Sequence, residues 1–247
     1  MKLAERSWEE AAAHFEAGGG VILPAGSTEQ HGPIGLIGTD AFCAEAVALA
    51  AAERCGALVA PPLAYAPAEF NMGFPGTLSV SVETFARLAG DVLDALARHG
   101  AGFVYVLNAH GANIAPLGEV CAARPALRTR LRSWWDFAEV GRLRADYYGD
   151  WEGMHATPSE IAITLVGMRR IPGAPPPPER LSPEFLAAHA GDRHGPPEAH
   201  RAAFPDGRVG SHSALARPEH GARLLGAAAK AVAADVAALA RGAPGVG

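Results

Sequence analysis

The chain has 247 residues, of which 49% are hydrophobic and 19% are charged, and its formal net charge is −5. This hydrophobic content is enough for a packed core and argues against a disordered chain. The mild negative charge gives no reason to expect nucleic acid or an anionic membrane as a partner. The length fits one large α/β domain or two small ones.

The amino terminus and the cysteines indicate the cellular compartment. No apolar run is long enough for a transmembrane helix, and the first residues, MKLAERSWEE, lack the apolar stretch of a signal peptide. The three cysteines, Cys43, Cys55 and Cys121, form no C-x-x-C pair. These features predict a cytoplasmic protein in which any metal site uses His, Asp and Glu.

Apolar runs and helix caps alternate along the chain. Apolar runs predict strands at 21–23, 58–60 and 103–107, and a further strand is predicted at 128–135. Caps and Ala-rich runs predict helices at 8–17, 41–54, 82–99, 158–168 and 218–241, with another starting at Pro116. Strands that alternate with helices predict an α/β fold with a parallel sheet covered on both faces.

Two segments lack this alternation. The long loop 61–77 suggests function, because loops of that length are uncommon inside a compact domain. The Pro-rich segment 171–197 fits a linker, but too little chain follows it for a second domain. We therefore expect one domain over residues 1–247.

The first polar cluster lies in the stretch 21–40, VILPAGSTEQHGPIGLIGTD, whose strand we expect to break at Pro24. Glu29 and His31 are two residues apart, so in extended backbone they project to the same side. Asp40 stands just before the helix expected from residue 41. Carboxylates and imidazole bind zinc, manganese or a similar ion. The alternative is a polar loop without metal.

A second cluster surrounds His110, which follows the buried strand at 103–107. The small residues Gly111 and Ala112 would let a metal ion or a substrate approach the backbone closely. The alternative is a histidine at a strand end that is hydrogen-bonded to backbone. In parallel α/β sheets, ligands bind beyond the carboxyl ends of the strands, where this cluster falls.

The third cluster is Trp151-Glu152-Gly153-Met154-His155, followed by Glu160. Thr157 and Glu160 form a capping box, so Glu160 could act only as a helix cap. The functional interpretation makes Glu160 a metal ligand and His155 a proton carrier, since histidine titrates near neutrality.

Other catalytic motifs are missing from the sequence. It has no phosphate-binding G-x-x-x-x-G-K-[ST] and no G-x-S-x-G elbow. Surface or structural roles are expected for the remaining histidines: His14, His99, His189, His194, His200, His212 and His220.

Together the clusters resemble the creatininase (creatinine amidohydrolase) family. LPAGSTEQHGPIGLIGTD resembles the signature loop of that family, and the segment 108–113, NAHGAN, looks like its Asn-Gly-His-Gly-Gly-Asn. The segment 155–160 resembles its His-Ala-x-x-x-Glu, and 74–79, FPGTLS, matches the loop between the first two motifs. The order and spacing agree over about residues 20 to 165.

The resemblance implies an α/β three-layer sandwich, with a mostly parallel sheet and helices on both faces. It also implies two divalent metal ions per subunit, zinc or manganese. On the family pattern Glu29 and His110 bind one ion, His31 and Glu160 bind the other, and Asp40 bridges the two. The family is often hexameric, so the resemblance implies a homo-oligomer.

The resemblance further implies roles for residues near the metals. Trp151 looks like an aromatic wall for the substrate, and His155 looks like the catalytic acid/base beside Glu160. Glu152 stands where creatininase itself has Asp. At Gly111 and Ala112 this chain departs from creatininase, which has Tyr-Glu after the metal-binding histidine. That departure argues against creatinine as the substrate.

From these observations we expect a metal-dependent amidohydrolase that cleaves a C–N bond in a small cyclic or linear amide. The attacking group would be a hydroxide held by two divalent metal ions. One alternative is a formamide deformylase or short-peptide hydrolase of the same family. Another is a non-catalytic metal-binding assembly protein.

Overall fold

The computed structural model describes residues 1–190, 194–242 and 245. Within this part of the chain a four-stranded sheet has the order β2-β1-β3-β4, and each neighbouring pair is parallel. The strands are β1 (Val21–Ala25), β2 (Leu58–Val59), β3 (Val104–Asn108) and β4 (Thr129–Ser133). The predicted parallel sheet is therefore confirmed.

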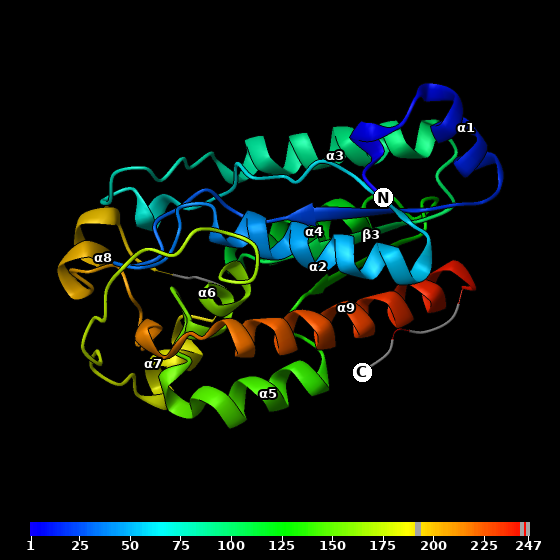
Figure 1. Ribbon diagram of the computed structural model, residues 1–247. Coiled ribbons are helices and arrows are strands. Elements are labelled where there is room, and N and C mark those ends of the chain that lie inside the picture. Colours follow the sequence, from blue (N-terminus) through cyan, green and yellow to red (C-terminus); the bar gives the residue numbers. More distant parts are fainter. Residues whose placement is uncertain (191–193, 243–244, 246–247) are drawn as a thin grey trace.

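Helices cover both faces of the sheet (Figure 1). One face packs against α2 (Thr39–Cys55), α5 (Ala138–Tyr148), α6 (Pro158–Thr164) and α9 (Pro218–Ala240). The other packs against α1 (Trp8–Glu16), α3 (Val82–Arg98) and α4 (Ile114–Ala122). This is the three-layer α/β sandwich that the sequence predicts.

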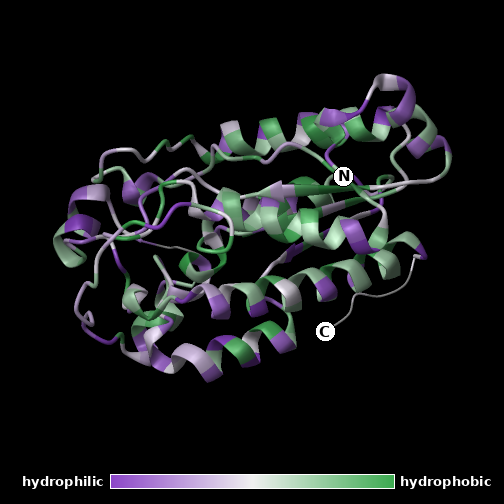
Figure 2. Cartoon of the chain, in the orientation of Figure 1, coloured by the Kyte–Doolittle hydropathy of each residue, from purple (hydrophilic) through white to green (hydrophobic). Residues whose placement is uncertain are grey.

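Strands β1, β2 and β3 are largely apolar and are buried on both faces, whereas the edge strand β4 contains two arginines and is only partly buried. Ile22 and Tyr105 belong to the core under α2 and α9, whereas Val21 and Val104 belong to the core under α3 and α4. This alternation follows from the two-residue period of a strand. Hydrophobic and hydrophilic residues alternate along the covering helices, as expected for helices with one buried side (Figure 2).

Several boundaries differ from the predictions. Strand β1 does not break at Pro24. Strand β2 pairs only with Val21 and Ile22, so the absence of a backbone N–H at Pro24 costs no hydrogen bond between β1 and β2. Asp40 lies inside the first turn of α2 and not before the helix. Helix α4 begins at Ile114, two residues before the expected start, and α6 ends at Thr164.

The sequence also missed three helices. Helix α5 lies in a stretch for which the sequence predicts no helix or strand. The Pro-rich segment and the residues after it contain α7 (Pro183–Ala188) and α8 (Pro197–Ala203). Short 3₁₀ helices complete the described elements: η1 (Leu3–Glu5), η2 (Glu69–Asn71), η3 (Gly111–Asn113), η4 (Gly149–Trp151) and η5 (Ser213–Leu215).

Helices α7 and α8 lie at the end of the molecule away from the amino terminus and from the last turn of α9 (Figure 1). None of the helices in the described part of the chain combines the length and the apolar character that a membrane-spanning segment needs.

Candidate active site

The polar clusters of the sequence meet where β1 and β3 end. The last residues of these strands are register partners. Glu29 and His31 follow β1, His110 follows β3, and Asp40 reaches the same place from α2. All four side chains are buried, with at most 3% of each residue exposed. The carboxyl edge of the sheet thus gathers ionisable groups in its interior, as the sequence predicts.

The distances between these groups are short. Nε2 of His31 lies 2.9 Å from Oδ1 of Asp40 and 3.8 Å from Oε1 of Glu160. Nδ1 of His110 lies 3.2 Å from Oδ2 of Asp40 and 3.3 Å from Oε1 of Glu29. Two ligand atoms on one tetrahedral zinc ion are about 3.4 Å apart. The groups therefore form two adjacent sets, Glu29–Asp40–His110 and His31–Asp40–Glu160, that share Asp40, and a third set, Glu29–His31–His155, overlaps with both.

Three histidines of the site are oriented by backbone carbonyls. The bonds are His31 Nδ1 to Glu29 O (3.0 Å), His110 Nε2 to Pro67 O (2.8 Å) and His155 Nε2 to Gln30 O (2.7 Å). Because a carbonyl oxygen only accepts, the ring nitrogen in each bond carries the proton. The other ring nitrogen points at the carboxylates, which is how proteins orient histidine ligands of a metal.

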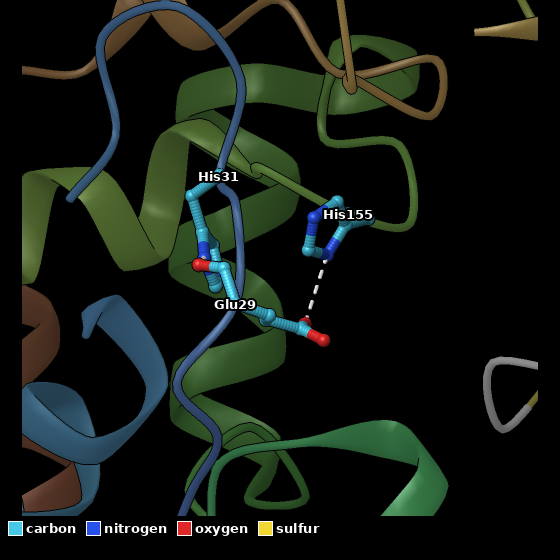
Figure 3. Close-up of side chains that lie close together, drawn as sticks. All are labelled: Glu29, His31 and His155. Carbon is cyan, nitrogen blue, oxygen red and sulfur yellow. Dashed lines mark hydrogen bonds and ion pairs between the residues drawn. The ribbon is translucent and has the colours of Figure 1, made fainter. Parts of the chain in front are cut away.

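His155 contributes to the same cluster from the segment before α6. Figure 3 shows its ring facing the carboxylate of Glu29, with His31 beside them; Nδ1 of His155 lies 3.4 Å from Oε1 of Glu29. Ala156 follows in the left-handed conformation, with φ of 56°. A non-glycine residue in that region is uncommon, and such strain concentrates at functional sites.

The carboxylates of the cluster have fewer hydrogen bonds than their burial requires. Both carboxylate oxygens of Glu29 and Oδ2 of Asp40 are buried, and no described residue donates a hydrogen bond of normal geometry to them. Moving an ionised carboxylate from water into a protein interior costs on the order of several kcal/mol, unless a cation or hydrogen-bond donors compensate its charge. These atoms fit a site for metal cations.

The shifted pKa values of Glu160 and His31 also fit a site for cations. Burial raises the pKa of Glu160 to about 8, against the opposing charge of His31. Burial alone would lower the pKa of His31, but the charge and hydrogen bond of Asp40 outweigh it and raise that pKa to about 10. The carboxylates thus draw positive charge into the cluster, which protons on histidine supply when no other cation does.

Glu160 forms the helix cap that the sequence predicts, and its carboxylate also lies close to the other ionisable groups. Oγ1 of Thr157 accepts from the backbone N–H of Glu160 at 3.2 Å, and the Glu160 carboxylate accepts from the backbone N–H of Thr157, so the capping box exists. The same oxygen, Oε1, lies 3.8 Å from Nε2 of His31. The cap therefore holds the carboxylate where it joins the second set.

A cavity of about 260 Å³ opens onto these groups. Its lining comprises Glu29, Asp40, Ala109, His110, Gly111, Ile114, Trp134, Trp135, Arg144, Gly153, Met154, His155, Thr157 and Glu160. Gly111 lies in this wall, as the sequence suggested for a substrate-binding residue. The ring of Trp151 instead packs against His212 and under the guanidinium of Arg180, outside the set of lining residues.

Two other residues assigned to substrate binding are also outside that lining. Ala112 lies in η3, behind Gly111. Glu152 accepts a hydrogen bond from Nε of Arg144 at 2.9 Å, and Arg144 is the residue of this pair that lines the cavity.

Sequence reasoning missed a second layer around the site. The ring of Phe70 stacks on His110, with centroids 6.5 Å apart, and also contacts His194 and His200. His200 is 3% exposed, so it does not lie on the surface. Gln30 Nε2 donates to Oδ1 of Asn71 at 2.7 Å and so ties the first motif to η2. These contacts carry no local signal in the sequence.

Comparison with known proteins gives concordant results. The family model for creatininase, described as creatinine amidohydrolase, matches residues 4–236. The creatinine amidohydrolase of Pseudomonas putida is 31% identical over 182 residues, which are 66% of this chain and 70% of that protein. The mycofactocin precursor peptide peptidase of Mycolicibacterium smegmatis is 37% identical over 108 residues, 41% of this chain and 43% of that protein.

Solved structures of creatininase superpose on most of the chain. A manganese form is 25% identical with a TM-score of 0.75, and a Zn–Zn form is 26% identical with a TM-score of 0.73. Each comparison covers 95% of this chain and 96% of the other. From the family match, the sequence identity and the shared fold, the chain belongs to the creatininase family of amidohydrolases.

Proposed function

We propose that this protein uses two divalent metal ions, zinc or manganese, to hydrolyse a C–N bond in a small cyclic or linear amide. The observation that carries the proposal is the position of Asp40, which presents one carboxylate oxygen to His31 and the other to His110. A carboxylate between two histidines of separate sets is arranged as a bridge between two ions.

Within this proposal Glu29 and His110 would hold one ion, His31 and Glu160 would hold the other, and Asp40 would contribute to both sites. The fit rests on the buried carboxylate oxygens without hydrogen-bond donors and on the histidine orientations described above. When bound, two close divalent cations lower the pKa of a water molecule to about 7 and polarise the carbonyl of the amide.

His155 moves the proton in this proposal. Burial lowers its pKa to about 3 in spite of the charge of Glu29, so the ring is neutral at pH 7. Nε2 is bound to the carbonyl of Gln30, which leaves Nδ1 as the basic atom. Nδ1 takes the proton that the attacking water loses and passes it to the leaving nitrogen. The carboxylate of Glu29, 3.4 Å away, stabilises the charged ring in between.

The remaining wall binds the substrate and excludes water. Ile114, Trp134 and Trp135 give one side of the cavity an apolar surface, and Gly111 adds no side chain to it. The substrate therefore meets ring and aliphatic surface on one side and the charged cluster on the other. Such a cavity suits a small molecule with a polar reacting group.

A second candidate is hydrolysis of short peptides or formamides with the same metals and residues. The similarity to the mycofactocin precursor peptide peptidase favours this candidate, although it covers less than half of either chain. A non-catalytic assembly protein is the third alternative. Its disadvantage is that four of the ionisable groups, Glu29, Asp40, His110 and Glu160, line a cavity and not a closed core.

A panel of amides tests the proposal. Creatinine, hydantoins, formamidopyrimidines and dipeptides are incubated with the chelated protein and with the same protein reloaded with zinc or manganese. We expect turnover of at least one class that depends on the metal and disappears in His155→Ala. No turnover of any class by protein that has bound metal would count against an enzyme and in favour of the assembly protein.

A further inference from the structure

One side chain on the wall of the active-site cavity carries a positive charge. Arg144, from α5, lines the same cavity as Glu29, Asp40 and His110. Its side chain is 24% exposed, so the guanidinium is neither in the dry core nor on the open surface. A permanent cation at that depth is uncommon unless it is paired or has a ligand.

The pairing of Arg144 accounts for only part of its hydrogen-bonding capacity. Nε donates to Oε1 of Glu152 at 2.9 Å, and the ring of Trp134 lies 5.8 Å from Cζ. Glu152 is held in turn by the hydroxyl of Ser159. Within the described residues no acceptor is bonded to Nη1 or Nη2 of Arg144. The guanidinium is thus oriented by one nitrogen while its other two nitrogens keep four N–H donors for a ligand.

Two other arginines serve as a comparison, because their guanidinium groups are paired with protein groups alone. Arg142, also on α5, is 57% exposed and bridges Glu139 and Asp146 on the surface. Arg208 is 3% exposed at its side chain, and its guanidinium is bonded to Asp206 and to the carbonyl of Pro176. Neither of them lines the cavity. Arg144 differs from both because it lines the cavity and, among the described residues, only its Nε is bonded to a protein group.

We infer that Arg144 recognises a carboxylate of the substrate, so that the amide cleaved here carries a carboxylate close to the scissile bond. A guanidinium with two terminal nitrogens available binds a carboxylate through two parallel hydrogen bonds. The aromatic and aliphatic neighbours lower the local dielectric constant, which strengthens such bonds. The inference rests on the proposed amide hydrolysis and narrows its substrate to acylated amino acids, including dipeptides.

The size of the cavity agrees with this class. The ionisable cluster and Arg144 border the same volume of about 260 Å³, so one small molecule can reach both. An N-formyl or N-acetyl amino acid would place its amide carbonyl at the cluster and its carboxylate at the guanidinium. Neutral cyclic amides have no group that matches Arg144 and would leave its donors without a partner, which is unfavourable in a dehydrated site.

Matched pairs of substrates test the inference. N-formylalanine, N-acetylalanine and alanylalanine are compared with their C-terminal carboxamides, using zinc-loaded protein. We expect the wild type to prefer the carboxylates in kcat/KM by on the order of a hundredfold, the range for hydrogen bonds to a charged group. Arg144→Gln should lose that preference, mainly through a higher KM for the carboxylates.

Two further variants separate recognition from folding. Arg144→Lys keeps a cation beside Glu152 but lacks the planar fork, so we expect an intermediate preference. Arg142→Gln removes a charge from the same helix without changing the cavity, so its preference should equal that of the wild type. Far-UV circular dichroism confirms that each variant is folded.

A binding measurement keeps the inference separate from the proposed function. Trp134 and Trp135 line the cavity, so their fluorescence reports N-acetylalanine binding to the metal-free protein. We expect saturable quenching in the wild type and in Arg142→Gln, and at least ~10-fold weaker binding in Arg144→Gln. Equal quenching in all three, or equal cleavage of carboxylates and carboxamides by the wild type, would overturn the inference. If no substrate is cleaved, the result counts against the proposed amide hydrolysis. The fluorescence titration with N-acetylalanine then tests by itself whether Arg144 binds a carboxylate.

Discussion

Nδ1 of His110 lies 3.2 Å from Oδ2 of Asp40, although the two residues come from different elements. His110 follows the carboxyl end of β3, and Asp40 belongs to the first turn of α2. The other carboxylate oxygen of Asp40, Oδ1, lies 2.9 Å from Nε2 of His31. One carboxylate therefore faces two histidines from opposite sides, and the account of the site depends on this arrangement.

The first prediction concerns Asp40→Asn. An amide has nearly the shape of the carboxylate but no charge, so it cannot offset the charge of two cations. We expect loss of both metal ions after dialysis and a fall in amide hydrolysis of at least ~100-fold, the scale for removing a charge-stabilising group. Elemental analysis gives the metal content. Normal metal content in Asp40→Asn would show that the two sets are held by other atoms.

The second prediction separates the two roles of Glu160. Glu160→Gln should preserve the capping box, because glutamine can also accept from the backbone N–H of Thr157. The metal held with His31 should be largely lost, and hydrolysis should fall by at least ~100-fold. Thermal unfolding with and without chelator provides the control, because a ligand that binds only the native state stabilises it. The difference in thermal stability between Glu160→Gln and the wild type should shrink when both proteins are metal-free. If Glu160→Gln retains two metal ions and normal turnover, Glu160 acts only as a helix cap.

The third prediction concerns creatinine. Gly111 borders the cavity without a side chain, and Ala112 lies outside the lining residues, so this chain offers the substrate no aromatic ring or carboxylate at these two positions. We expect creatinine hydrolysis to be lower than that of the preferred amide by on the order of a hundredfold, a typical cost of missing contacts. Steady-state kinetics with both substrates measures the ratio, and comparable kcat/KM values would show that these contacts are dispensable.

The fourth prediction concerns stability away from the site. The hydroxyl of Tyr105 donates to Oδ2 of Asp235 at 2.9 Å, and Arg130 donates to Oδ1 at 2.7 Å. Asp235 is fully buried, so Tyr105→Phe removes a bond to a buried charge and should lower the free energy of unfolding by about 1–3 kcal/mol. Urea unfolding measures this loss. Metal content should stay unchanged, because Tyr105 lies near the amino end of β3; loss of metal would reveal a coupling that the structure does not show.

Local signals in the sequence accounted for much of the fold. The capping boxes at Ser7 and Thr157 are formed, and the apolar runs are parallel strands. The site residues that follow β1 and β3 come together because the carboxyl ends of parallel strands share one edge. These features depend on neighbouring residues or on a general rule of topology, so a single sequence suffices to predict them.

The missed features depend on partners far away in the chain. Only Val140 and Tyr148 of helix α5 are buried, and the helix is stabilised by packing on α9, which its own sequence does not reveal. Pro24 continues β1 only because β2 ends early. The prolines at the starts of α7 and α8, Pro183 and Pro197, were a usable signal, since proline is favoured in the first helical turn. The place of Arg144 in the cavity follows from Glu152 and Trp134, and no motif marks it.

The most direct test of the account is to locate manganese in crystals by anomalous diffraction. The account predicts two peaks ~3.5–4 Å apart, as in other two-metal hydrolases. One should lie among Glu29, Asp40 and His110 and the other among His31, Asp40 and Glu160. A single peak, or peaks that Asp40 does not contact, in crystals soaked to saturation would contradict the two-metal site and the mechanism built on it.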